Sequence, residues 1–104
     1  MTNDRLRGHV DLLLLAVLEH EEAHGYRLVE VLRGRSDGAF DLPEGTVYPS
    51  LYRLERSGLV ASRWERVEGR RRRVYRLTSR GAEELARHRS EWRDFARAME
   101  AVVA

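Results

Sequence analysis

Seven consecutive apolar residues, Leu12 to Leu18, constrain the fold of this 104-residue chain more than any other stretch. Together with Val10 they predict a helix from about His9 to Glu21 that is apolar nearly all the way round. Such a helix has to be covered on more than one side. The chain has room for a single domain, so the cover comes either from that domain or from a partner subunit.

Composition argues against several classes of protein. The chain contains no cysteine, which excludes a disulfide framework, a thiol nucleophile and a thiolate metal site. No signal peptide is visible, and the apolar run is far shorter than the roughly 20 residues that span a bilayer. The four histidines lack metal-ligand spacing, and no Ser/His/Asp set or phosphate loop occurs. We therefore expect a cytoplasmic protein with no membrane partner, no catalytic residue, no metal and no cofactor.

The stretch from Pro43 to Gly58 predicts a helix with one buried face and one free face. Two interpretations of its start are open: either Thr46 caps it and Pro49 lies in its first turn, or it begins at Pro43 and Pro49 bends it. In both, the N–H groups and positive dipole of the first turn suit phosphate. The alternative is a surface helix whose polar face only meets solvent. The apolar stripe is Val47, Leu51 and Leu54, and the face turned away is assigned to Thr46, Ser50, Arg53 and Ser57.

The segments before this helix follow the order of a helix-turn-helix. Residues 1–8 are expected to be frayed, and residues 21–24 to form a short polar turn. Helical spacing resumes from Gly25 to Leu32, and residues 34–41 have the composition of a loop. Two short helices, a connection and a helix with a free outward face are typical of this DNA-binding arrangement.

After Gly58 the pattern changes to that of an antiparallel hairpin. We predict strands at residues 59–67 and 73–77, joined by a turn at residues 68–72, with Val74 and Arg76 facing opposite to Tyr75 and Leu77. Seven arginines lie within residues 63–76 against two acids, and the four adjacent ones, Arg70 to Arg73, are placed at the tip. Four like charges destabilise a turn unless an anion meets them, so we expect contact with nucleic acid.

The net charge of +2 conceals a separation of charge along the chain. Residues 43–80 hold 10 Arg and 4 acids, whereas residues 1–42 hold 5 Arg and 8 acids, and residues 81–104 hold 4 Arg and 5 acids. All nineteen basic residues are Arg, so their positions carry more information than their type. The middle of the chain is thus the predicted basic face.

The last helix is predicted from about Arg80 to the C-terminus, capped by Thr78 or Ser79. Six of its residues, five apolar and one histidine, are spaced 3, 4, 3, 4 and 3 residues apart, as in a coiled-coil seam. A helix of this length offers more apolar edge than a small domain covers, which favours a homodimer, and we expect it to pack also against the leucine-rich first helix. The seam consists of Leu85, His88, Trp92, Phe95, Met99 and Val102.

These elements predict a mainly α fold with a small β-hairpin: a winged helix-turn-helix at residues 1–77 and a C-terminal dimerisation helix at residues 78–104, forming one compact unit. Three stretches then make the chain resemble the PadR family of transcriptional regulators. They are His24 to Tyr26, Gly45 to Glu55 leading into Gly58 to Val60, and Arg73 to Gly81. Val74 departs from the adjacent aromatics that often end the family's wing, and the single C-terminal helix indicates the family's shorter branch.

The resemblance implies a homodimeric repressor that binds inverted repeats upstream of detoxification or efflux genes and in many cases leaves DNA on binding a small aromatic or drug-like effector. We expect Arg53 to read guanine in the major groove, the wing arginines to follow the adjacent backbone or minor groove, and the operator to be a palindrome with half-sites about 34 Å apart. For Tyr26, contact with a phosphate and burial in the core are both open. The predicted DNA contacts are Tyr26, Thr46, Tyr48, Pro49, Ser50, Arg53, Arg70, Arg71, Arg72 and Arg73.

The candidates for dimer contact or effector binding are Leu14, Leu85, His88, Trp92, Phe95 and Met99. Two interpretations of Trp92 and Phe95 are open: two copies form a flat aromatic slot for a ligand, or they are plain dimer core. Two alternative functions are also open, namely a winged-helix module that binds an acidic protein and an architectural DNA binder without an effector.

Overall fold

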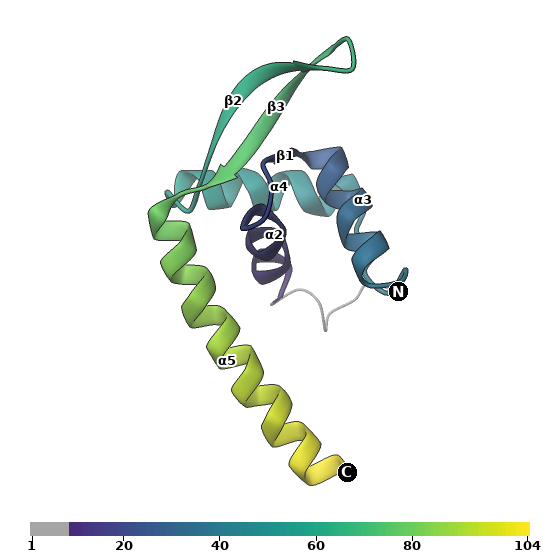
Figure 1. Cartoon of the computed structure of the whole chain (residues 1–104). Coiled ribbons are helices and arrows are strands. Elements are labelled where there is room, and N and C mark those ends of the chain that lie inside the picture. The colour runs from purple at the N-terminus through teal and green to yellow at the C-terminus, as the bar shows by residue number, and fades with distance from the viewer. Residues whose placement is uncertain (1–8) are drawn as a thin grey trace.

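The computed structural model describes residues 9–104, so the expectation for residues 1–8 lies outside the described part. Helices and a small sheet alternate along the chain, which confirms the mainly α fold with a hairpin and a long last helix (Figure 1). The elements are α2 (Val10–Leu18), β1 (Ala23–His24), α3 (Gly25–Arg35), α4 (Glu44–Arg56), β2 (Val60–Val67), β3 (Arg70–Leu77) and α5 (Ser79–Val103).

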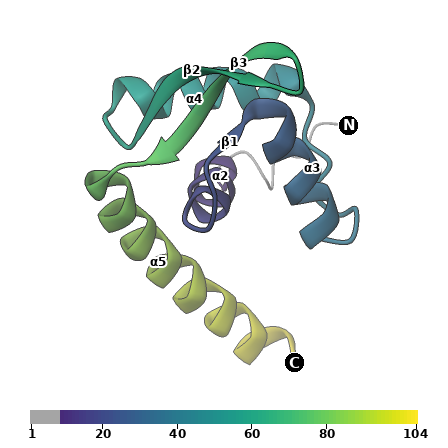
Figure 2. The same cartoon turned by 45° about the horizontal axis from the view of Figure 1, so that its top comes forward.

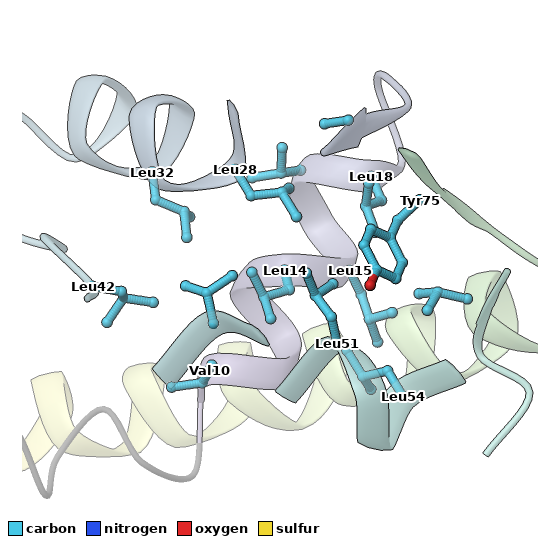
Figure 3. Close-up of a cluster of buried hydrophobic side chains, with 14 of the residues drawn as sticks. Val10, Leu14, Leu15, Leu18, Leu28, Leu32, Leu42, Leu51, Leu54 and Tyr75 are labelled. Carbon is cyan, nitrogen blue, oxygen red and sulfur yellow. The ribbon is translucent and has the colours of Figure 1, made fainter. Parts of the chain in front are cut away.

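The leucine-rich helix α2 lies at the centre of the core, as its composition requires. Leu14 and Leu15 are completely buried, and they lie among Leu28 of α3 and Leu51 of α4 (Figure 3). The same core cluster includes Leu85 of α5. The rest of its own domain therefore covers α2 on more than one side. Part of α2 is less well covered, since three of its apolar side chains are only partly buried: Leu12, Leu13 and Ala16.

The sheet is antiparallel and three-stranded, in the order β1-β3-β2. The prediction of a polar turn was wrong for Ala23 and His24, which form the two-residue β1 and pair with Tyr75 and Val74 of β3. Ala23 is buried. β1 is the edge strand of the sheet opposite β2, and it leads directly into α3. Val74 and Tyr75 are both buried although they point to opposite faces.

The hairpin turn is shorter than predicted. β2 and β3 stay paired as far as Val67 and Arg70, which leaves only Glu68 and Gly69 between them. Both have positive φ, 51° and 77°, as a type I′ turn requires. The arginines expected together at the tip therefore lie along β3, where successive side chains point to opposite faces.

Two helix starts decide between alternatives that the sequence left open. α4 starts at Glu44 with Pro43 as its N-cap, which agrees with the second interpretation of its start and places Pro49 inside the helix. Thr78 caps α5, because its Oγ accepts a hydrogen bond from the Gly81 N–H at 3.0 Å. From there the 25-residue α5 runs past α2, and its C-terminal half projects away from the other helices (Figures 1 and 2).

Candidate nucleic-acid interface

The outward face of α4 differs from the one assigned from the sequence. Val47, Leu51 and Leu54 are buried as predicted. Ser50 is also buried, with 6% of its surface exposed, and its Oγ donates to the Thr46 carbonyl at 2.9 Å. The prediction that Ser50 faces outward was therefore wrong, and Thr46 is only partly exposed at the edge.

The reason lies in the geometry of the helix, which turns by about 100° per residue. Thr46, Ser50 and Arg53 each precede a residue of the apolar stripe by one position, so they lie beside the stripe, not opposite it. The residues that precede a stripe residue by two positions lie about 200° round the helix from it, on the opposite side, and they are exposed. This exposed face of α4 consists of Gly45, Pro49, Tyr52 and Arg56, with Tyr48 and Arg53 on its two flanks.

Two arginines on this helix are held differently. Arg56 lies over the ring of Tyr52, with its Cζ 5.7 Å from the ring centroid, and Tyr52 itself is 62% exposed. Arg53 instead donates from Nη2 to Oδ1 of Asp11 on α2 at 2.6 Å. Arg56 and Tyr52 are thus additional candidates for DNA contact, which the sequence interpretation missed because it chose the wrong face.

The start of α3 lies against the start of α4. A Cβ on Gly25 would lie 2.5 Å from ring carbons of Tyr48, so only glycine lets this ring lie over the backbone there. His24 caps α3 by accepting the Arg27 N–H at Nδ1, 3.2 Å away, and it stacks on the exposed Tyr26. The predicted candidates Tyr26 and Tyr48 are therefore surface residues next to the first turn of α4.

The two faces of the hairpin carry different charge. On one face Trp64 lies between two arginines of β3, with Arg71 Cζ 4.6 Å and Arg73 Cζ 5.2 Å from its ring. Trp64 is 52% exposed. Arg66, two residues further along β2, lies on the same face and pairs with Arg71. We call this surface the tryptophan face; its charged residues on β2 and β3 are Arg66, Arg71 and Arg73.

A hydrogen-bond chain fixes the tryptophan face next to α4. Arg73 donates from Nε to Ser62 Oγ at 2.8 Å, and Ser62 in turn donates to Oε2 of Glu55 on α4 at 2.7 Å. The guanidinium of Arg73 also lies 3.8 Å from the same carboxylate. Arg73 of the tryptophan face is in this way tied to Glu55, the residue that precedes Arg56 of the exposed face of α4.

On the other side, the groove face, acids lie close to the arginines. Arg63 lies 2.6 Å from Glu22 and 2.7 Å from Glu65, and its hydrogen bonds to these carboxylates raise the pKa of the guanidinium. A groove of about 450 Å³ separates this face from α3 and is lined by five carboxylates as well as by Arg27 and Arg72. The carboxylates are those of Glu21, Glu22, Glu30, Glu65 and Glu68.

The four predicted wing contacts are therefore divided between the faces. Arg71 and Arg73 lie on the tryptophan face, whereas Arg70 and Arg72 lie on the groove face. Trp64 and Arg66 join the first pair, and strict alternation on both strands was the signal that could have found them.

The candidates for dimer contact are divided as well. Leu14 and Leu85 are buried in the chain's own core, so the prediction that they offer a surface to a partner was wrong. His88 is half-buried, whereas Trp92, Phe95 and Met99 are exposed, Phe95 to 58%. The C-terminal half of α5 thus carries an uncovered apolar stripe, which continues to Val102 at 86% exposure.

Within residues 9–104, no helix combines the length and apolarity needed to cross a membrane. Over the same range, no group of three or more His, Cys, Asp or Glu side chains is arranged to hold a metal ion.

Comparisons with known proteins agree with this architecture. The model of the "Transcriptional regulator PadR-like family" matches residues 14–87. The chain is 38% identical over 91 residues to the transcriptional regulator Rv3488 of Mycobacterium tuberculosis, covering 88% of this chain and 82% of that protein. A transcriptional regulator from Clostridium thermocellum is similar in structure, with a TM-score of 0.89 at 28% identity and coverage of 100% and 99% of the two chains. A PadR family transcription regulator from Clostridium difficile has a TM-score of 0.79 at 31% identity, covering 93% of this chain and 100% of that one.

Proposed function

The chain belongs to the PadR-like family of transcriptional regulators, and from this we propose that it is a homodimeric, sequence-specific DNA-binding repressor of detoxification or efflux genes. The observation that carries the proposal is the exposed face of α4 together with the tryptophan face, which is hydrogen-bonded to Glu55 of α4 through Ser62. These surfaces combine aromatic side chains with arginines, of which Arg53 and Arg73 also lie near an acid, whereas five carboxylates line the groove on the other side of the wing.

In this proposal α4 enters the major groove with Pro49, Tyr52 and Arg56 foremost and Arg53 at the flank. An α-helix fits that groove, and arginine is the side chain that most often contacts guanine there. The tryptophan face then follows the neighbouring backbone or minor groove with Arg66, Arg71 and Arg73.

The second copy covers the apolar stripe of α5. Trp92, Phe95 and Met99 together with Val102 form an exposed apolar row of the kind that marks an interaction site. Leu13 and Ala16 on α2 are further apolar side chains that are only partly buried. A two-fold axis between two copies would place two recognition helices on one palindromic operator.

A small aromatic effector fits between the copies at Trp92 and Phe95, and this part of the proposal derives from the family resemblance. The plain dimer core is the competing interpretation, and the variant Trp92→Ala separates the two. If the residue lines a ligand slot, the variant stays dimeric and loses the release of DNA by aromatic compounds. If it is dimer core, the variant dissociates in sedimentation equilibrium.

The first experiment measures binding to the DNA upstream of the protein's own gene against scrambled duplex of equal length, at near-physiological salt. We expect a preference of about a thousandfold or more. The variant Arg56→Gln should weaken specific binding by roughly tenfold to a hundredfold, and Arg93→Gln on α5, with the same change of charge, serves as its control. Equal binding to both duplexes would instead support an architectural DNA binder, and loss of all duplex binding in moderate salt would support a protein-binding module.

The proposed dimer is tested separately by placing a charged residue in the apolar stripe of α5. We expect wild-type protein to sediment at twice the chain mass of 12.1 kDa. Phe95→Glu should sediment as a monomer and lose operator binding, while Ser90→Glu, on the opposite side of α5, should keep both properties. A wild-type monomer that still binds its operator would refute the dimer.

A further inference from the structure

Arg53, at the edge of the exposed face of α4, is bound to an acid from another helix. Its Nη2 lies 2.6 Å from Oδ1 of Asp11, which stands in the first turn of α2, 42 residues earlier in the chain. The Arg53 side chain is 59% exposed and that of Asp11 33%, so both groups remain accessible from the side of α4.

This contact changes what Arg53 can bind. A guanidinium has five N–H donors, and the bond from Nη2 to Asp11 leaves others free. A phosphate approaching these donors also meets the negative charge of Asp11, which cancels much of the attraction. The O6 and N7 atoms of guanine carry no net charge, so they can accept from the same donors without this repulsion.

We infer that Asp11 is a positioning residue that sets the specificity of DNA recognition by reserving Arg53 for base edges and keeping it from phosphates. The inference rests on the proposed function. In this role Asp11 lowers the affinity of the protein for non-cognate sequences. Such sequences far outnumber the operator in a genome and compete with it for the protein.

The test compares Asp11→Asn with Asp94→Asn on the upstream duplex and on scrambled duplex across a salt series. Asp94 pairs with Arg97 on α5 at 2.6 Å, so its variant makes the same change of charge and frees an arginine far along the last helix. Arg53→Gln and the double variant Asp11→Asn/Arg53→Gln complete a cycle that shows whether Asp11 acts through Arg53. Thermal unfolding checks that each variant is folded.

For Asp11→Asn we expect binding to scrambled duplex to tighten roughly 1.5- to fivefold per subunit, the range for release of an exposed ion pair. The salt dependence on that duplex should steepen by about one unit per subunit, and the preference for the upstream duplex should fall. Asp94→Asn should match wild type, and the effect should vanish in the Arg53→Gln background.

The inference is overturned if Asp11→Asn binds scrambled duplex no more tightly than Asp94→Asn does, or if its effect persists without Arg53. Failure of the proposed function gives a different result, because wild-type protein alone would then show no preference between the two duplexes.

Discussion

Replacing Gly25 by alanine tests how closely the start of α3 packs against Tyr48 of α4. The Cβ of alanine would lie 2.5 Å from Tyr48 Cε1 and Cζ and 2.7 Å from its hydroxyl oxygen, so the ring has to move. Alanine favours helix by about 0.5–1 kcal/mol over glycine, whereas overpacking costs about 1–3 kcal/mol. Because Tyr48 is 38% exposed and can swing outward, we expect a net loss of about 0–2 kcal/mol in the free energy of unfolding.

Gly34 near the end of the same helix is the matched control, since nothing lies within 4 Å of its added Cβ. Gly34→Ala should stabilise by up to about 1 kcal/mol, measured by urea denaturation. In the background Tyr48→Ala, Gly25→Ala should lose its cost and become neutral or stabilising. If Gly25→Ala stabilises as much as Gly34→Ala while Tyr48 is present, the contact between the ring and the backbone is not what requires glycine.

Three further predictions concern the sheet and its neighbours. Burial of His24, and to a smaller extent the positive charge of Arg72, lowers the pKa of His24 below its ordinary value of 6.5. The imidazole of the folded protein therefore takes up a proton less readily than that of the unfolded chain. Stability should therefore be complete above pH 6.5 and fall as the pH drops below it. His24→Asn, which keeps a capping acceptor, should flatten that fall in thermal unfolding between pH 7 and 5, and an unchanged slope would exclude His24 as its cause. Glu68→Asn should stabilise by about 0.5–1 kcal/mol in urea, because asparagine tolerates the positive φ of 51° better; a loss of stability would contradict this. Arg71→Gln should reduce the salt dependence of DNA binding by about one unit per subunit, and Arg70→Gln, on the groove face, by clearly less; equal effects would show that both faces of the wing meet DNA.

The sequence was sufficient to predict the apolar stripe of α4 but not its opposite face. A period of 3.6 residues identifies which positions are buried together, and Val47, Leu51 and Leu54 satisfy it. Polarity then suggested Ser50 for the outside, although a serine can satisfy its hydroxyl within its own helix by donating to the carbonyl four residues back, as this one does to Thr46. Tyr52 was assigned to neither face, and this aromatic side chain is 62% exposed.

The wing shows a different limit. The arginine run was visible in the sequence, but its meaning depended on the turn, because shortening the turn to Glu68 and Gly69 moves Arg70 to Arg72 into a strand. Once they are in a strand, alternation divides them between a surface with Trp64 and a groove lined with carboxylates. Those carboxylates come from α3, from the chain just before β1 and from the wing itself, so only the folded structure brings them to one face.

The long last helix shows why periodicity predicts contact but not the partner. Its seam keeps a single heptad spacing from Leu85 to Val102, yet Leu85 is buried in the chain's own core and Val102 is 86% exposed. At 1.5 Å per residue, the 25 residues of α5 extend for roughly 37 Å, and α2, the helix beside which it runs, has only 9 residues. The length of α5 therefore decides where intramolecular packing ends. From Trp92 onward the same seam is exposed, and in the proposed dimer this is the part that a second copy covers.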